Sequence, residues 1–174
     1  MAYNAMALTQ TRSTAMAAKT PEKPRQCLTI ADMKVGDRFV RDYTVSYDDV
    51  RKFAEISGDW NPVHHDPEYA ATTIFKAQIA HGMISVAKFS GIFGMDTPGL
   101  GAVWTMQNNT FKAPVYLDKP YKAIAEVSKV DAETNTVWYK TWCEAADGTV
   151  VLEGEGSLKP IPAKVKAKMM GTAA

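Results

Sequence analysis

The sequence of 174 residues lacks most of the features that mark metal-binding, redox, membrane or nucleic-acid-binding proteins. Its two cysteines, Cys27 and Cys143, lie far apart and form no CxxC pair, so they predict neither a zinc site nor a redox dithiol and suit a reducing compartment. The longest apolar segment, residues 83–95, contains Lys88 and is shorter than the roughly 18 apolar residues of a membrane helix. Twenty basic residues balance nineteen acidic ones without a basic stripe, which argues against a nucleic-acid partner.

The two ends of the chain differ in composition from its middle. Residues 1–27 are rich in Ala, Thr and Met, hold a single acid, Glu22, and contain no apolar stretch of the kind that directs secretion. We expect them to be a flexible extension of a cytoplasmic protein, with an organelle transit peptide as the alternative. Residues 161–174 carry three lysines among alanines and predict a solvated tail, with a contact to phosphates as the alternative. Residues 28–160 are long enough for one domain with a core.

The first part of this domain combines a strand with short helices. Residues 38–46 are rich in β-branched and aromatic side chains and predict a strand. Ser46, with Asp49 three residues later, is typical of a helix N-terminus, and Gly58 is typical of a helix end. Residues 59–65 are therefore expected to form a loop.

The second part combines one long apolar helix with several strands. Residues 66–72 begin with Asp-Pro, a typical helix start, and predict a brief helix. Residues 81–94 are apolar on nearly every face, which is typical of a helix wrapped by other elements. The turns that follow are short, and Asp147-Gly148 is a strong hairpin signal. Four long strands are predicted here: residues 102–112, 121–131, 136–145 and 149–159.

These elements together predict an α+β fold. Strands that follow one another through short turns pair antiparallel, and the strand at residues 38–46 brings their number to about five. The predicted architecture is a curved antiparallel sheet wrapped around a long buried central helix. Because the edge strands of such a sheet are often paired with another copy, we expect a homodimer.

The predicted loop after the first helix carries side chains that can move protons. Asp59, Asn61 and His64 lie there beside the apolar Trp60 and Val63. The alternative is a plain turn, because Asp and Asn side chains bond their own backbone and an Asn-Pro pair starts turns. On spacing alone, the turn explains the segment better.

A second motif lies at the start of the apolar helix. His81-Gly82-Met83 places a glycine where backbone N–H groups have no partner within the helix, and such groups bind ligand oxygens. An N–H at this place is a good donor to a thioester oxygen that gains negative charge. The alternative is an ordinary helix start, at which His81 fixes the first turn. Ser90, polar within the helix, is either a structural hydroxyl or part of a pocket.

The most specific motifs are SGDWNPVH at 57–64, Asp66-Pro67, AHGM at 80–83, FSG at 89–91 and FKAPV at 111–115. In this order they resemble the MaoC-like dehydratases, and specifically the (R)-specific enoyl-CoA hydratases, over residues 39–159. The resemblance implies the hot-dog fold and a hydro-lyase that reversibly hydrates trans-2-enoyl-CoA to (R)-3-hydroxyacyl-CoA. It implies an acyl-CoA thioester as substrate, and neither a metal nor a redox cofactor. Fatty-acid metabolism and the supply of polyhydroxyalkanoate precursors both use such a reaction.

The resemblance also assigns roles to residues. Asp59 and His64 match the catalytic pair, and Asn61 is expected to orient them. The Gly82 backbone N–H matches the oxyanion donor, and Ser90 matches the serine of the substrate pocket. His64 takes a proton from a water molecule and Asp59 delivers one to C2 of the substrate, or the two roles are exchanged.

The acyl chain that suits this site is expected to be short. Phe93 lies one helical turn beyond Ser90, so its bulk is expected to shorten the acyl pocket. This position predicts a substrate similar to crotonyl-CoA. Trp60 and Lys88 depart from the family's common pattern, but neither is a catalytic position.

Three alternatives compete with this function. A hot-dog acyl-CoA thioesterase shares the fold and the substrate, but typically has a different acidic residue near the central helix. A non-catalytic acyl-CoA-binding module would keep the buried helix and lose the catalytic pair. A metal site at His64, His65 and Asp66 is disfavoured, because adjacent histidines on a loop point in different directions and no HExxH spacing accompanies them.

Overall fold

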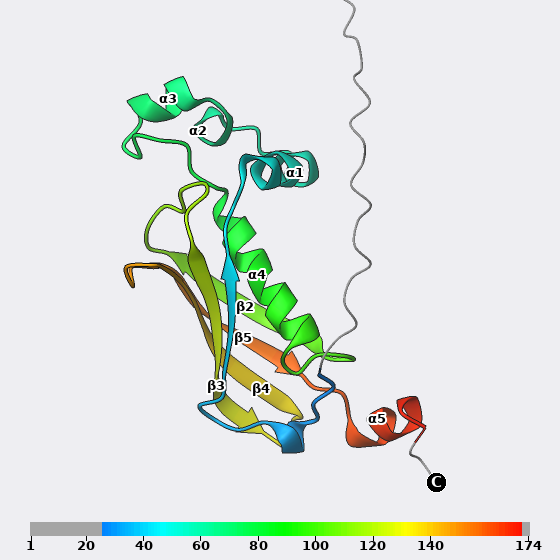
Figure 1. Ribbon diagram of the computed structural model, residues 1–174. Helices are drawn as coiled ribbons and strands as arrows, with labels where there is room; N and C mark the ends of the chain where they lie inside the picture. Colours follow the sequence, from blue (N-terminus) through cyan, green and yellow to red (C-terminus); the bar gives the residue numbers. More distant parts are fainter. Residues whose placement is uncertain (1–25, 172–174) are drawn as a thin grey trace, which may run out of the picture.

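A computed structural model describes residues 26–171. The predicted extension lies outside the described residues except for its last two, as do the last three residues of the predicted tail. Figure 1 shows a strongly curved sheet with one long helix, α4, along its inner face. The elements are the 3-10 turn η1 (Ile30–Asp32), β1 (Arg38–Tyr43), α1 (Tyr47–Ser57), α2 (Pro62–His65), α3 (Pro67–Thr72), α4 (Gly82–Met95), β2 (Val103–Phe111), β3 (Tyr121–Asp131), β4 (Thr136–Ala145), β5 (Val150–Lys159) and α5 (Ala163–Met169).

The sheet has five antiparallel strands in the order β1-β3-β4-β5-β2. β3 and β4 match the predicted strands residue for residue, and the other three differ from the prediction by at most three residues at an end. Asn135, at φ 51°, lies between β3 and β4, and Gly148, at φ 85°, lies between β4 and β5. Asn and Gly adopt such positive φ angles most easily, which explains the turns. The α+β class and the curved sheet around one helix are confirmed.

The central strand β4 shows why one face of the sheet is covered. Val137, Tyr139, Thr141 and Cys143 are buried and alternate with more exposed residues, as the two-residue period of a strand requires. The Tyr139 hydroxyl shares a hydrogen bond of 2.9 Å with the Thr97 hydroxyl, so its polar end is satisfied. Burial raises the pKa of the Cys143 thiol to about 11, which makes it a core residue and not a nucleophile at neutral pH.

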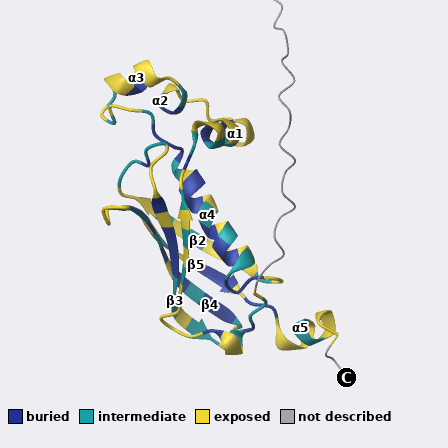
Figure 2. Ribbon diagram, viewed as in Figure 1, coloured by how far each residue is buried: buried dark blue, intermediate teal, exposed yellow. Residues whose placement is uncertain are grey.

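Helix α4 is buried where it faces the sheet and open along one stripe. Buried and more exposed residues alternate along α4 (Figure 2). Phe89 and Ile92 are fully buried in the core, and burial of such a side chain contributes about 1.5–3 kcal/mol. Met83, Ala87 and Ser90 are exposed, and their spacing of four and three residues places them on one face. The predicted wrapping of this helix is therefore found on its sheet side, while the stripe stays uncovered by the described chain.

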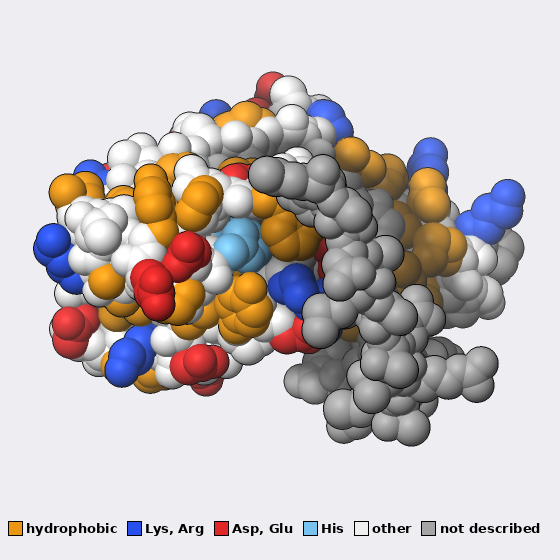
Figure 3. Space-filling model, turned by 90° about the horizontal axis from the view of Figure 1, so that it is seen from above, with side chains coloured by type: hydrophobic (Ala, Val, Ile, Leu, Met, Phe, Trp, Pro, Cys, Tyr) orange, Lys and Arg blue, Asp and Glu red, His pale blue; other side chains and the backbone are white. Residues whose placement is uncertain are grey.

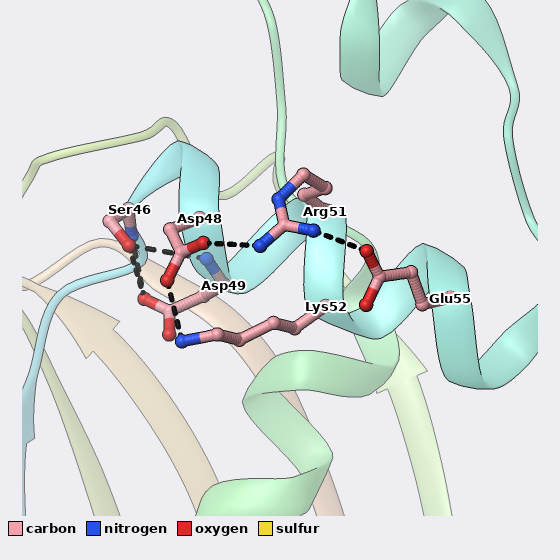
Figure 4. A network of polar contacts seen from close by, with 6 residues as sticks. All are labelled: Ser46, Asp48, Asp49, Arg51, Lys52 and Glu55. Atoms are coloured by element: carbon pink, nitrogen blue, oxygen red, sulfur yellow. Dashed lines mark hydrogen bonds and ion pairs between the residues drawn. The ribbon is translucent and has the colours of Figure 1, made fainter. Parts of the chain in front are cut away.

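Helix α1 begins at a capping box and ends at a left-handed glycine, as predicted. The Ser46 hydroxyl oxygen accepts the Asp49 N–H at 3.2 Å, and the Asp49 carboxylate accepts the Ser46 N–H at 2.9 Å. Gly58 ends the helix at φ 78°. Figure 4 shows this cap beside the ion pairs on the surface of α1, which join Arg51 to Asp48 and Glu55 and join Lys52 to Asp48.

The segment after α1 differs from the prediction of a loop over residues 59–65. Pro62–His65 form one helical turn, α2. Asn61 caps this turn, because its side-chain oxygen accepts the Val63 N–H at 3.1 Å, and Pro62 takes the first helical position, where no N–H is needed. These two signals are present in the sequence, and the loop prediction overlooked them.

The last described residues form a short helix, α5, within the predicted tail. None of its residues is buried, and Lys166 Nζ lies 3.5 Å from a carboxylate oxygen of Asp32. This contact holds α5 near the start of the described chain. Among the helices of residues 26–171, none has the length and the apolar character needed to cross a membrane.

Candidate active site

The polar segment that follows α1 lies near the N-terminal end of α4 (Figure 1). The left-handed Gly58 turns the chain out of α1, and Asn61 starts α2, so Asp59 lies in the turn between the two helices. The Asp59 carboxylate accepts the Asn61 N–H at 3.2 Å, and 51% of the Asp59 side chain is exposed. The turn considered as the alternative is therefore present. Because the turn orients the Asp59 carboxylate, it is compatible with a catalytic role for this residue.

The His64 ring is fixed from the other side. Its Nδ1 lies 2.8 Å from the Ile79 carbonyl oxygen, and only 9% of His64 is exposed. Because a carbonyl oxygen only accepts, Nδ1 carries the proton, and a neutral ring then has its lone pair on Nε2. Nε2 lies 3.8 Å from Asp59 Oδ2. This distance is too long for a direct hydrogen bond, so both atoms are free to bond a third group.

A second imidazole, His81, contacts both members of this pair. Its Nε2 lies 2.9 Å from the Asp59 carbonyl oxygen, and its ring centroid lies 3.9 Å from that of His64. Burial is the main cause that lowers the pKa of His81; the neighbouring His64 acts in the same direction, and the bond to Asp59 opposes both. His81 is therefore neutral at pH 7.

A cavity of about 440 Å³ opens beside His64. Gly82, the first residue of α4, lies in its wall, and the Gly82 N–H is one of the donors that a helix start leaves without an intrahelical partner. Figure 3, seen from above, shows a small histidine surface with hydrophobic side chains beside it and with an acidic and a basic side chain close by. An apolar wall strengthens the hydrogen bonds made inside it. The apolar residues that line this cavity include Phe75, Ile79, Met83, Val115 and Leu152.

The ring of Phe111, at the end of β2, lies directly against Gly82. A Cβ atom at residue 82 would lie 2.5 Å from Phe111 Cε1, which is far inside van der Waals contact. Glycine is thus the residue that lets this ring cover the start of α4. Because 54% of Phe111 is exposed, the ring is held on one side only.

Ser90 and Phe93 lie elsewhere on α4. Ser90 lines a groove of about 630 Å³ between α4 and β2, and it lies about 12 Å along the helix from its start at 1.5 Å per residue. Phe93 is buried, with its ring centroid 5.1 Å from that of Trp104 and 5.0 Å from that of Tyr139. The described chain does not bring either residue to the first cavity. Phe93 fills the core, and the expected pocket shared by Phe93 and Ser90 is not found within one chain.

Sequence reasoning missed three features of this site. One is the Ile79 carbonyl that fixes the imidazole, because no side-chain pattern marks a backbone oxygen. Another is Ser85, which lines the cavity and accepts a hydrogen bond of 3.0 Å from the Tyr43 hydroxyl. Its spacing of three residues from Gly82 was the available signal. The third is the side chain of His81, which was expected only to fix the start of α4.

Asp59, His64 and His81 also place one possible metal-ligand atom each within 4.8 Å of one another. The His81 Nε2 that lies 3.8 Å from Asp59 Oδ2 is also 2.9 Å from the Asp59 carbonyl oxygen, and the proton that Nε2 donates there leaves this atom no lone pair for an ion. In the metal site considered from the sequence, at His64, His65 and Asp66, the rings of the two histidines lie at 85° to each other. Both arrangements suit hydrogen bonding better than the ligation of one ion.

Comparisons with known proteins identify the family of the chain. The family described as MaoC like domain matches residues 31–147. The chain is similar to a Rhodospirillum rubrum protein named (R)-specific enoyl-CoA hydratase, with 39% identity over 133 residues, which are 76% of this chain and 91% of that protein. It is similar to the 3-hydroxybutyryl-CoA dehydratase of Methylorubrum extorquens, with 36% identity over 136 residues, 78% of this chain and 85% of that protein. The solved structure of R-Hydratase PhaJ1 from Pseudomonas aeruginosa superposes with a TM-score of 0.74 at 36% identity, covering 79% of this chain and 88% of that chain.

Proposed function

The chain belongs to the MaoC-like family, and we propose that it is an (R)-specific enoyl-CoA hydratase in which Asp59, His64 and the Gly82 N–H act on one substrate. The observation that carries the proposal is the separation of 3.8 Å between Asp59 Oδ2 and His64 Nε2, beside a cavity whose wall contains Gly82. Hydration needs an acid, a base and an oxyanion donor around one water and one carbonyl.

The pair is suited to hold and activate a water molecule. His64 Nε2 and the Asp59 carboxylate are both hydrogen-bond acceptors, and a water molecule has two O–H groups to donate. When the water oxygen attacks C3 of the enoyl thioester, the pair takes one proton from the water and returns one proton to C2. One water molecule is thus added across the double bond, and no proton is left over. Both groups face the same position for a water molecule, so the acid and base roles belong to the pair and are not assigned to single residues.

The Gly82 N–H is suited to stabilise the thioester oxygen as C3 is attacked. Removal of a donor of this type typically lowers the rate about 10²–10³-fold. The start of α4 adds the positive end of the helix dipole, which also favours negative charge there. The apolar cavity wall strengthens both effects.

An assay with crotonyl-CoA tests this function directly. We expect the enoyl absorbance to decrease, with (R)-3-hydroxybutyryl-CoA as the product in chiral analysis. Release of free CoA would favour the thioesterase instead. Binding of the substrate without turnover would favour the non-catalytic module.

We propose in addition that the enzyme prefers short acyl chains. Bulky side chains such as Phe75 and Leu152 border the cavity beside His64 and limit the space for a long chain. Phe93, on which the sequence argument depended, is buried in the core and does not line this cavity within one chain. A series of enoyl-CoA substrates tests the preference: turnover on chains of about eight carbons that equals turnover on the four-carbon substrate would contradict it.

We further propose that two copies pair through β2. Both β1 and β2 are edge strands, but they differ in charge. β1 carries Arg38, Arg41 and Asp42 among its six residues, and charged side chains protect an edge against pairing. β2 carries no charged residue in nine. The uncharged edge is therefore the one open to a second copy.

The neighbouring surface supports the same edge. The exposed stripe of α4, formed by Met83, Ala87 and Ser90, borders the groove between α4 and β2. A copy paired at β2 would cover this stripe and enclose Ser90.

Sedimentation tests the pairing. The wild type should be a dimer, and Met106→Lys on β2 should yield monomers. Val40→Lys on β1 is the matched control and should stay dimeric. A monomeric wild type would contradict the pairing.

We propose that the protein works in the cytoplasm. The basic residues among residues 1–27 do not form the amphipathic arginine face typical of a transit peptide. The intact mass of the protein isolated from its own cells tests this: the full mass supports the proposal, and loss of these residues would indicate import and cleavage.

A further inference from the structure

His81 occupies the N-cap position of α4 without acting as a cap. Its side chain makes no hydrogen bond to the first turn of the helix, and only 3% of the residue is exposed. A capping side chain presents an acceptor atom to a free N–H of that turn. The His81 ring is turned toward the segment between α1 and α2, so its side chain serves something other than the helix start.

Three parts of the chain hold the His81 ring. Phe53 of α1 packs against it with a centroid distance of 4.9 Å, and His64 of α2 stacks on it at 3.9 Å. At its edge, Nε2 lies 2.9 Å from the Asp59 carbonyl oxygen. The ring therefore contacts both members of the proposed catalytic pair.

The bond to Asp59 fixes the tautomer of His81. Because the carbonyl oxygen only accepts, Nε2 donates and carries the proton. Nδ1 is then the unprotonated nitrogen, buried and without a hydrogen-bond partner in the part of the chain that the structure describes. The titratable groups that face the ring are Asp59, His64 and His65, and burial keeps the pKa of His81 below its ordinary value. A neutral ring lies on the His64 ring without charge repulsion.

We propose that His81 is a positioning residue for the Asp59–His64 pair, acting through its Nε2–H on the Asp59 carbonyl oxygen and through its ring on the His64 imidazole. The other hydrogen bonds of Asp59 within residues 26–171 are local, with Ser57 and Asn61. His81 thus supplies the bond that ties the Asp59 turn to α4. The inference rests on the proposed function, because the separation of the pair matters only if the two groups act together.

One short segment then organises all the reacting groups. The Ile79 carbonyl fixes the His64 ring, His81 bonds Asp59, and the next residue, Gly82, lines the cavity at the start of α4. Loss of the His81 bond releases Asp59 alone, so the separation of the pair changes while the oxyanion donor stays in place. A misplacement of about 1 Å is enough to lower a rate about 100-fold.

Two substitutions of His81 test this role. His81→Phe keeps a ring that can stack and removes the N–H, whereas His81→Gln keeps an N–H near the position of Nε2. On crotonyl-CoA, we expect His81→Phe to lower kcat about 10- to 100-fold with KM within about 3-fold of the wild type, and His81→Gln to recover kcat to within about 5-fold of it.

The matched control is His65→Phe, which replaces the adjacent histidine and should keep kcat within about 3-fold of the wild type. Equal losses in the two His81 variants, in step with their thermal midpoints, would mean that His81 only supports the fold and would overturn the proposal. A His81→Phe variant with the wild-type kcat would overturn it as well.

A second measurement does not depend on turnover. Nitrogen-15 NMR of the substrate-free wild type at about pH 7 should show a neutral His81 protonated at Nε2 and His64 protonated at Nδ1. A proton on Nδ1 of His81 would overturn the positioning role whatever the rate of the enzyme. A protein that shows the expected tautomers but hydrates no enoyl-CoA would overturn the proposed function, and with it the catalytic purpose of the contact.

Discussion

The sheet wrapped around α4 and the segment α1–α3 beyond the end of that helix are held together in different ways. In the first region, Phe89, Ile92 and Tyr139 are fully buried, and the hydrophobic effect supplies the stability. The second region is largely exposed (Figure 2), and it leaves Ile56 and Ile74 more than 80% exposed. Among the described residues, Val50 is the buried residue that α1–α3 contribute to the hydrophobic core cluster, with the partly buried Phe53 packed against it.

Directed hydrogen bonds order the second region. Ser46, Asn61 and Asp66 cap its three helices, and the Ile79 carbonyl and the His81 side chain hold the rings and turns of the site. Hydrophobic burial has no direction, whereas a hydrogen bond weakens steeply with distance and angle. Burial can thus fix a fold, and hydrogen bonds are needed to place individual reacting atoms. The predictions below test this division.

The largest effect is expected when the site is broken and the sheet is left intact. Asp59→Ala and His64→Ala should each lower kcat/KM about 10²–10⁴-fold, because a positioned acid or base contributes this much. The thermal midpoint of Asp59→Ala should change little, since half of that side chain is exposed. Steady-state kinetics and thermal unfolding measure both quantities. Asp48→Ala, an exposed acid on α1, is the matched control and should keep the wild-type rate; folded Asp59 and His64 variants with near-normal rates would contradict the site.

The converse experiment weakens the sheet region and leaves the site intact. Phe89→Ala should lower the free energy of unfolding by about 3–5 kcal/mol, because it opens a cavity where a fully buried ring packs. The variant should keep its kcat per folded molecule. Urea unfolding measures the first quantity, and the assay corrected for the folded fraction measures the second. Ile74→Ala, an exposed apolar residue near α3, is the control and should change stability by less than about 0.5 kcal/mol.

The fold could be predicted because its signals are local and repeated. Buried and more exposed side chains alternate over parts of β3 and β4, and short turns mark where these strands end. A single turn such as α2 has no period to detect, so only its cap and its proline could reveal it. The apolar character of α4 could not predict that its stripe stays uncovered within one chain. A helix face that the chain leaves open has the same apolar composition as a face that the chain covers.

The site could be predicted only in part, for the same physical reason. Asp59, His64 and Gly82 belong to short contiguous motifs, and the structure brings them together. The contact of His81 with Asp59 depends on how α1 and α2 pack on the start of α4, and no local pattern encodes that packing. The burial of Phe93 likewise depends on the facing strands. Motifs identify the reacting groups, while tertiary packing determines which neighbours position them.

The third prediction concerns pH and assigns a smaller effect to the site region. The pKa of His81 is lowered from its ordinary value of 6.5, chiefly by burial. Below about pH 6.5 the unfolded chain binds a proton at this residue that the folded chain does not, so proton uptake favours unfolding. The contribution of His81 to stability is therefore complete above this pH and decreases as the pH falls toward the lower pKa of the folded state. Thermal midpoints between about pH 7.5 and about 5.5 should decrease, and less steeply for His81→Gln; equal slopes would contradict this assignment.

The smallest effects are expected on the surface of α1, where a hydrogen-bonded cap and exposed ion pairs lie side by side (Figure 4). Ser46→Ala removes the acceptor of the Asp49 N–H and should lower the free energy of unfolding by about 1 kcal/mol. Arg51→Ala removes two ion pairs and should change it less, because water and salt screen exposed charges. Urea unfolding at low and high salt compares the two variants, and only the effect of Arg51→Ala should shrink with salt. If Arg51→Ala destabilised the protein as much as Ser46→Ala, charge attraction would hold this region, and directed hydrogen bonds would no longer distinguish it from the sheet.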